Sequence, residues 1–136
     1  MASEFDFSSM DKSDFECLKF DDSSVYFGQV AWINDKGKIC PKSEGKIKVR
    51  HGIGSQMFVA EDQSVLCKYE GQWKAGKKHG EGVISYPDGS VYAGCLENEM
   101  KEGFGKFVWP NGDEYNGSWV QDRMDGFGTF NHHEVK

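Results

Sequence analysis

The side chains most able to carry out chemistry in this chain are its histidines and cysteines, and neither set has the spacing of a reactive site. His132 and His133 are adjacent, with no cysteine and no spaced pair of acids beside them, so we expect both to be surface residues. The four cysteines lie 23, 27 and 28 residues apart without a CxxC pair, which argues against a zinc site and a disulfide framework. They are Cys17, Cys40, Cys67 and Cys95. We expect reduced thiols, no metal and no cofactor.

A second candidate for chemistry is the Gly80-x-Gly82 pair, which recurs further along the chain. A phosphate-binding loop needs such glycines between a strand and a helix, where backbone N–H groups point at the phosphate. Here the pair continues into a strand pattern, and no nucleophile with a neighbouring base can be identified. The sequence therefore predicts that the chain is not an enzyme.

Charge provides a third kind of candidate site. The net charge of −6 argues against nucleic acid as a partner, because phosphate binding needs a basic face. Residues 36 to 50, however, carry six bases against Glu44. These bases are Lys36, Lys38, Lys42, Lys46, Lys48 and Arg50. They could attract anionic lipid head groups or an acidic protein surface, and a solvated hairpin with no fixed partner is the alternative.

The first residues show no targeting signal, since Met1 to Glu4 lack a basic segment followed by an apolar run. No stretch approaches the roughly 18 apolar residues of a membrane span. Residues 1 to 24 are acidic, with spaced aromatic residues and no strand pattern. We expect a cytoplasmic protein whose residues 1 to 24 form a disordered N-terminal arm. This arm either docks its aromatic rings on a partner or only makes the chain more soluble.

The elements that must position any site come from an internal repeat. Residues 69 to 91, 92 to 114 and 115 to 136 align with one another at a period of 23. The aligned positions are Tyr69, Tyr92 and Tyr115; Gly71, Gly94 and Gly117; Trp73, Leu96 and Trp119; Gly80, Gly103 and Gly126; and Gly82, Gly105 and Gly128. Five positions that coincide in three units indicate one structural unit repeated.

Each unit contains two short runs of alternating character, Tyr-x-Gly-x-Trp and Gly-x-Gly followed by an aromatic residue, separated by a polar segment such as Ala75 to His79. This pattern predicts two strands joined by a turn. Pro87-Asp88-Gly89 and Pro110-Asn111-Gly112 link the units, and their Gly residues supply the positive φ of tight turns. The sequence therefore predicts an all-β fold, a continuous antiparallel meander of repeated β-hairpins.

A divergent unit is expected upstream, over residues 25 to 68. The run from Val25 to Val30 resembles the start of a unit, and His51 to Gly54 resembles the later run from His79 to Gly82. About 15 extra residues separate these two runs, and they carry the basic segment. We interpret the region as one hairpin elongated by a basic insertion.

Glycine normally weakens a strand, so its regular recurrence needs an explanation. One explanation is that each strand glycine leaves room for a large aromatic ring from a neighbouring strand. The other is that the glycines only mark bends. The aromatic residues at fixed offsets from the glycines favour the first.

The unit YEGQWKAGKKHGEGVISYPDGSV and its two successors resemble MORN repeats. The resemblance is firm over residues 69 to 131 and weak over residues 25 to 68. Cys95-Leu96 and Glu99 depart from the family pattern, and the third unit lacks the closing Asp-Gly. The resemblance implies an elongated, twisted, single-layer sheet that acts as a scaffold.

Family members recur in cilia and flagella, in cytoskeletal collars and in lipid-associated proteins. From this we expect a non-catalytic adaptor that binds other subunits of a cytoskeletal assembly, most plausibly an axoneme with its radial spokes. A peripheral phospholipid-binding module that uses residues 36 to 50 is the alternative. A homo-oligomer is left open by the sequence.

Two phenylalanines are the first candidates for partner contacts. Phe104 and Phe127 stand between the paired glycines and should point away from the face that carries the other rings. They either form an exposed partner site or pack on the N-terminal segment or on a second copy. The ring ladder is a further candidate, as internal packing or as a peptide groove. It includes Trp73, Tyr86, Trp109 and Trp119, together with Tyr92 and Tyr115.

Overall fold

The computed structural model describes residues 12–62 and 64–133 and consists of strands apart from one short 3₁₀ turn. The elements, in chain order, are β1 (Glu16–Lys19), β2 (Ser24–Ile33), β3 (Ile39–Cys40), η1 (Lys42–Glu44), β4 (Ile47–Val59), β5 (Val65–Lys74), β6 (Lys77–Ser85), β7 (Val91–Glu97), β8 (Met100–Val108), β9 (Glu114–Val120) and β10 (Arg123–Asn131).

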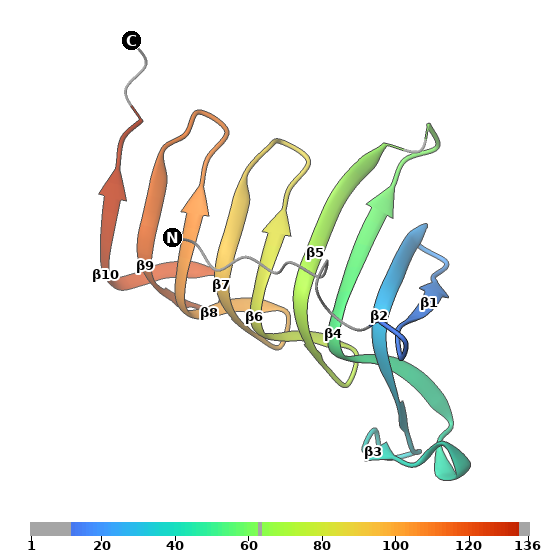
Figure 1. Cartoon of the computed structure of the whole chain (residues 1–136). Helices are drawn as coiled ribbons and strands as arrows, with labels where there is room; N and C mark the ends of the chain where they lie inside the picture. The colour runs from blue at the N-terminus through green and yellow to red at the C-terminus, as the bar shows by residue number, and fades with distance from the viewer. Residues whose placement is uncertain (1–11, 63, 134–136) are drawn as a thin grey trace.

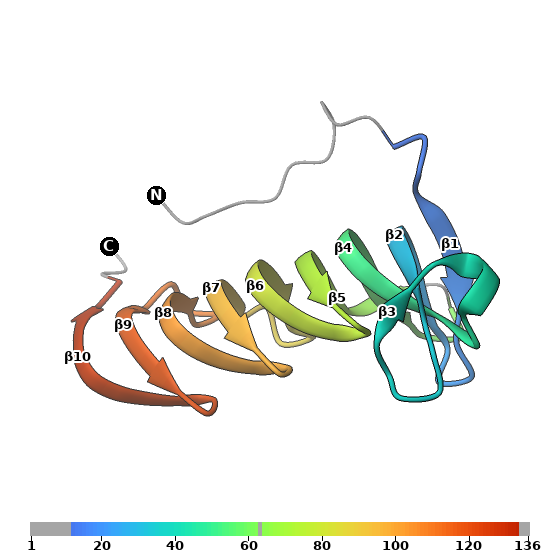
Figure 2. The same ribbon diagram turned by 90° about the horizontal axis from the view of Figure 1, so that it is seen from below.

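All of these strands belong to one antiparallel sheet in which neighbours in sequence are neighbours in space. The order is β1-β2-β4-β5-β6-β7-β8-β9-β10, and β3 pairs with β2 beside this path. Figure 1 shows the hairpins standing in a single row, and Figure 2 shows that the strands are bowed, so that the sheet has a concave and a convex face. The predicted all-β, single-layer meander of hairpins is confirmed.

The 23-residue units correspond to individual hairpins: β5–β6, β7–β8 and β9–β10. Upstream, β2 pairs with β4 along nearly its whole length, and the connection between them carries β3 and η1. The glycines of the links between units have the positive φ expected of tight turns, 96° at Gly89 and 94° at Gly112.

The N-terminal region contains a strand where the sequence pattern indicates none. Within residues 1 to 24, β1 pairs with β2 from Glu16↔Gly28 to Lys19↔Val25. The side chain of Phe15 packs edge-on against Phe27, with ring centroids 5.2 Å apart. A four-residue strand lacks the alternation that identifies longer strands, so only the pairing with β2 reveals it. Phe5 and Phe7 lie outside the described residues.

Eight glycines face one another across the sheet and form a continuous ladder. It runs Gly28, Gly54, Gly71, Gly82, Gly94, Gly105, Gly117 and Gly128, with each glycine opposite the next on the adjacent strand. A tyrosine ring lies over each hairpin's pair of glycines: a Cβ added at Gly82 would overlap the ring of Tyr69, and one at Gly105 would overlap that of Tyr92. The prediction that strand glycines leave room for rings is confirmed for this ladder.

The other glycine of each pair has a different function. Gly80, Gly103 and Gly126 have φ of 83°, 92° and 72°, a left-handed conformation that favours glycine. In each hairpin a register shift falls beside this glycine, where the strand bends. Both interpretations of the glycines therefore hold, each for one member of the pair.

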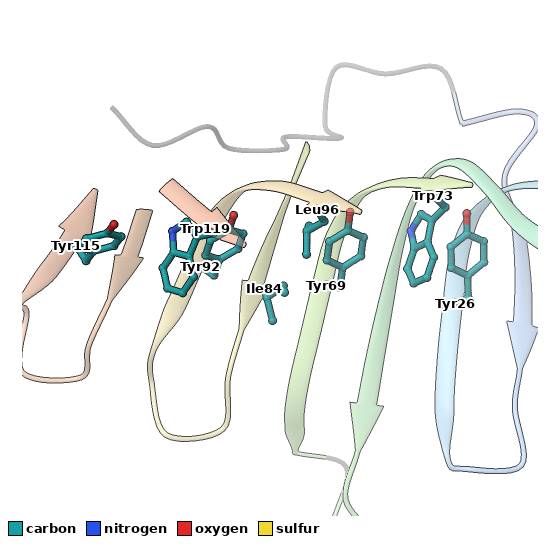
Figure 3. Close-up of a cluster of buried hydrophobic side chains, with 8 residues drawn as sticks. All are labelled: Tyr26, Tyr69, Trp73, Ile84, Tyr92, Leu96, Tyr115 and Trp119. Carbon is teal, nitrogen blue, oxygen red and sulfur yellow. The ribbon is translucent and has the colours of Figure 1, made fainter. Parts of the chain in front are cut away.

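The buried core is the row of rings on the concave face (Figure 3). Each tyrosine hydroxyl donates to the carbonyl three residues later, as Tyr69 does to Gln72 at 2.7 Å and Tyr92 to Cys95 at 2.7 Å. Tryptophan then joins one hairpin to the next, since Trp73 Nε1 donates to Gly54 O at 3.0 Å. The buried apolar residues are Tyr26, Tyr69, Trp73, Ile84, Tyr92, Ala93, Leu96, Tyr115 and Trp119.

Aspartates cap three of the links between strands. Asp88 accepts hydrogen bonds from the backbone N–H of Ser90 at 2.8 Å and from its hydroxyl at 2.6 Å. Asp22 and Asp62 accept the same two bonds from the serine two residues later. These bonds favour the ionised form, and the serine hydroxyl is the main reason that the pKa of each aspartate lies below its ordinary value of 3.8.

We expect these aspartates to make stability depend on pH on the acid side. Because the folded pKa of each aspartate is below the unfolded one, its contribution is present above the unfolded value and is lost as pH falls through the folded one. The urea midpoint should stay flat at neutral pH and fall below about pH 5. Asp62→Asn and Asp88→Asn should each make that fall shallower, and an unchanged acid limb in both variants would contradict the assignment.

Candidate partner-binding surfaces

The concave face carries a row of cations at equivalent positions of successive hairpins. Arg50, Lys78 and Lys101 each stand two residues before the glycine of positive φ at which the strand of their unit bends. In the same row Met124 takes this position in the last hairpin. The repeat therefore places three positive charges along the concave face.

Each cation lies over aromatic rings. The guanidinium carbon of Arg50 is 4.7 Å from the ring centroid of Trp73 and 4.8 Å from that of Phe20. The Nζ of Lys78 is 5.6 Å from the Tyr69 ring. The Nζ of Lys101 lies between 5.5 and 6.0 Å from four rings, Tyr86, Tyr92, Phe107 and Trp119. Such contacts within about 6 Å of a ring centroid are attractive because the quadrupole of the ring gives its face a negative electrostatic potential.

The turn of the following hairpin contacts each cation. Lys78 Nζ forms an ion pair of 3.0 Å with Glu99, and Lys101 Nζ lies 3.6 Å from Asp122. Both acids have positive φ, 73° and 70°, which costs energy for a residue with a side chain. Their carboxylates also accept from the backbone N–H of the two lysines, so contacts to the preceding hairpin offset this strain.

Arg50 is held where the first hairpin meets the second. One guanidinium nitrogen donates to Gly76 O at 2.9 Å, and the other donates to Gln56 Oε1. Burial lowers the pKa of Arg50, and the carboxylate of Glu99 acts in the opposite direction. The group keeps its charge, because an arginine titrates far above neutral pH.

These cations line a groove of about 510 Å³ on the concave face. Its walls combine the three cations with the acids Asp22, Glu99 and Asp122 and with half-buried or buried apolar side chains such as Ile84 and Tyr86. A space of this size lined by rings and fixed charges can hold side chains of an elongated segment, with apolar groups on the rings and oxygen acceptors on the cations.

The convex face carries the largest exposed aromatic groups. Phe104 is 72% exposed and Phe127 is 93% exposed. They lie on β8 and β10, separated by β9, where Ser118 stands opposite Phe104. The structure thus places both rings on the face away from the core, on two strands with β9 between them. That neither ring is covered among the described residues makes them candidates for a partner contact.

The tryptophans and tyrosine of the predicted site have unequal access. Trp73 and Trp119 are 4% and 5% exposed, and both are packed edge-on against tyrosines, so their described contacts hold the hairpins together. Tyr86 and Trp109 are half-buried, and both contact Phe107. Of these four, only Tyr86 and Trp109 present surface to a partner.

The fold divides the basic run 36–50. Lys48 forms an ion pair of 2.6 Å with Glu16 on β1, and Arg50 lies in the groove. The other four lysines are exposed on the connection between β2 and β4: Lys36, Lys38, Lys42 and Lys46. Two exposed isoleucines, Ile39 and Ile47, stand on the same extension. The six bases therefore do not form one patch.

Reasoning from the sequence did not identify the cation row. The alignment of the repeats with one another contains a signal for this row. Lys78 and Lys101 are one period of 23 apart, and Arg50 stands two residues before Gly52 as Lys78 does before Gly80. Basic residues in polar strand segments are usually solvated, so the pattern alone does not indicate contacts with rings.

A metal-binding cluster and a membrane-spanning helix are not found in the described residues. No group of three or more His, Cys, Asp or Glu side chains in 12–62 and 64–133 could hold a metal ion. No helix within these ranges is long and apolar enough to span a membrane.

Comparisons with known proteins agree with the repeat. The family model for the MORN repeat matches residues 69–91, 92–114 and 115–131. Alsin from Rattus norvegicus is 48% identical over 33 residues, and alsin from Homo sapiens is 46% identical over 33 residues. Each match covers 24% of this chain and 2% of alsin, so the chain spans a small part of these relatives.

Proposed function

Residues 69–131 are MORN repeats, a module that binds proteins or membranes, and from this premise we propose that the chain is a non-catalytic adaptor that holds partner proteins together. The proposed setting is a cytoskeletal assembly, the axoneme of a cilium or flagellum, by analogy with the family. Other subunits of that assembly would be the partners, and the chain would be located in the cytoplasm at the cytoskeleton.

The observation that carries this proposal is the exposure of Phe104 and Phe127 on the convex face, 72% and 93%. A single-layer sheet has no second layer to cover this face, and exposed aromatic groups close together mark contact sites. The groove on the concave face offers a second contact, for an elongated segment of the partner.

The proposal predicts that a charge at Phe104 removes partners. Tagged full-length chain would be used to capture proteins from detergent-extracted ciliated cells, beside a Phe104→Glu variant and a Phe104→Glu/Phe127→Glu variant. Axonemal proteins should be recovered with the native chain and reduced at least about tenfold with either variant, since a buried unpaired carboxylate costs several kcal/mol.

Asn116→Glu is the matched control, because it adds the same charge at an exposed position on β9 that faces Lys106. It should keep the captured set. If all four proteins captured the same set, the Phe104 and Phe127 site would be refuted, and recovery of no axonemal protein by the native chain would refute the proposed setting.

A membrane-binding alternative has one observation in its favour. The connection between β2 and β4 carries three exposed lysines, Lys38, Lys42 and Lys46, and the exposed Ile39 and Ile47 stand beside them. The lysines could bind anionic head groups, and the isoleucines could enter the apolar boundary of the lipid layer. On this alternative, sedimentation with phosphatidylserine vesicles should be lost in Lys38→Glu/Lys42→Glu/Lys46→Glu and should fall as salt is added. The adaptor proposal predicts no vesicle binding by the native chain.

A further inference from the structure

The groove on the concave face runs along almost the whole sheet. Its lining extends from Asp22, in the link between β1 and β2, to Asp122, in the turn between β9 and β10. Seven strands lie between these ends, β2 and then β4 to β9. Because neighbouring strands are about 4.8 Å apart, the groove is about 34 Å long. An occupant that fills it must therefore be a narrow, elongated segment.

The glycine ladder divides the groove into a cationic side and an apolar side. On β4, Arg50 precedes the ladder glycine Gly54, and Phe58 follows it. On β6, Lys78 and Ile84 stand before and after the ladder glycine in the same way. A segment that suits the groove therefore carries acids along one side and apolar groups along the other.

The cationic side contains one charge that lacks an acidic partner. Within residues 12–62 and 64–133, no carboxylate forms an ion pair with Arg50. The two lysines of the row each pair with an acid in the next turn, but in the turn that follows Arg50 the equivalent position is Gly76. The acceptors of the guanidinium, Gln56 Oε1 and Gly76 O, are both neutral. A carboxylate in the groove would therefore supply the partner that a half-buried charge needs.

The segment that precedes the described part of the chain has a matching pattern. Residues 1–11 include the run Glu4-Phe5-Asp6-Phe7. In an extended chain successive side chains point to opposite sides, so the two rings share one side and the two acids the other. At about 3.3 Å per residue, this segment reaches about 36 Å, which is enough to run the length of the groove.

The chain enters the sheet at one end of the groove. Glu16, the first residue of β1, pairs with Gly28, the first glycine of the ladder that divides the groove. Two residues later, Leu18 packs against the buried rings of the concave face. Residues 1–11 are therefore tethered beside the groove, and such a short tether gives an effective concentration on the order of millimolar.

From these observations we propose that residues 1–11 occupy the concave groove of their own chain. Phe5 and Phe7 lie on the apolar side, over Ile84 and the side chains beside it. The acids of the segment lie on the cationic side, where one of them pairs with Arg50. The spaced aromatic residues of the N-terminal arm are thus a ligand for the sheet that follows them.

A groove filled in this way is closed to other segments until the arm leaves it. The arm would then set a threshold for the groove contact of the adaptor, because a partner segment has to compete with a ligand on the same chain. Only this competition rests on the proposed function. The position of the arm does not, and the experiments below measure it without a partner.

A disulfide can locate the arm, because the native cysteines sample both faces of the sheet. Cys67 lines the groove, whereas Cys95 faces the convex side, since the next residue, Leu96, belongs to the buried core. The full chain with Ser9→Cys would be oxidised mildly, digested and analysed by mass spectrometry. Ser9 shares one side of an extended arm with Phe7, so its new thiol should link to Cys67 at least about tenfold more than to Cys95.

The matched control is the same thiol on an arm without rings, Phe5→Ser/Phe7→Ser/Ser9→Cys. Its tether has the same length, so a preference caused by the tether alone persists, whereas a preference for Cys67 caused by docking should be lost. Linkage to Cys17, which is exposed on β1, reports the reactivity of the new thiol in both chains. Equal linkage to the two faces in the first chain, or an undiminished preference in the control, would overturn the proposal.

The methyl groups of Ile84 provide a readout without an added cysteine. Their resonances in the full chain should shift in Phe5→Ser/Phe7→Ser, because a ring stacked over a methyl group changes its chemical shift. The resonances of Ile39 and Ile47, which are exposed outside the groove, should stay in place. Unmoved Ile84 resonances, or equal shifts at all three isoleucines, would contradict a specific site for the arm.

Discussion

Replacing Gly105 with alanine is expected to lower the free energy of unfolding by about 3 kcal/mol, at the upper end of what one added methyl group costs in a packed core. The three atoms nearest to a Cβ at this position all belong to the side chain of Tyr92. That ring is 0% exposed, and its hydroxyl donates to Cys95 O at 2.7 Å. The ring therefore cannot move aside without losing its hydrogen bond and its burial.

A double-mutant cycle separates this clash from the ordinary cost of changing a strand glycine. Urea denaturation would be measured for Gly105→Ala, Tyr92→Leu and the double variant. Because leucine vacates the space over the glycine, the second substitution should cost far less in the double variant than alone, giving a coupling energy of about 2 kcal/mol. Additive costs would show that the tyrosine ring is not the reason for the glycine.

Replacing Trp73 with alanine is expected to cost about 3–5 kcal/mol, as for other buried tryptophans. Its ring packs edge-on against Tyr26 at 5.4 Å and Tyr69 at 5.0 Å between centroids. Its Nε1 donates to Gly54 O at 3.0 Å, and the guanidinium of Arg50 lies on its face. Beside the backbone pairing of β4 with β5, Trp73 is therefore a side-chain link between the β2–β4 hairpin and the repeats that follow.

The loss of stability in Trp73→Ala should also be confined to one part of the sheet. In a row of repeats, stability is approximately the sum of each unit and its contacts with its neighbours, so weakening one junction uncouples the units on either side. Hydrogen exchange in Trp73→Ala should show faster opening of β2 and β4 than of β7 and β8. Trp109→Ala, which removes contacts to Phe107 and Phe130, should instead affect the last hairpin. Uniform acceleration in both variants would contradict this account.

Much of the fold could be predicted from the sequence because the repeat is local. A period of 23 with Tyr-x-Gly-x-Trp and Gly-x-Gly runs defines each hairpin from residues that are close in the chain, and the turn glycines mark the links. The pairing of rings with ladder glycines could also be predicted, since tyrosine and glycine recur at fixed offsets. Within the candidate site, the outward position of Phe104 follows from strand alternation alone.

The rest depends on contacts between segments that no local pattern connects. The sequence shows six bases between residues 36 and 50 as one run, but pairing of β1 with β2 brings Glu16 to Lys48, and the bend of the sheet turns Arg50 onto Trp73. The cation row and the groove exist only because the curved sheet stacks equivalent positions of successive hairpins over the rings. The free edge of β10 is likewise a property of the assembled sheet, because a strand has an open edge only once all the other pairings are made.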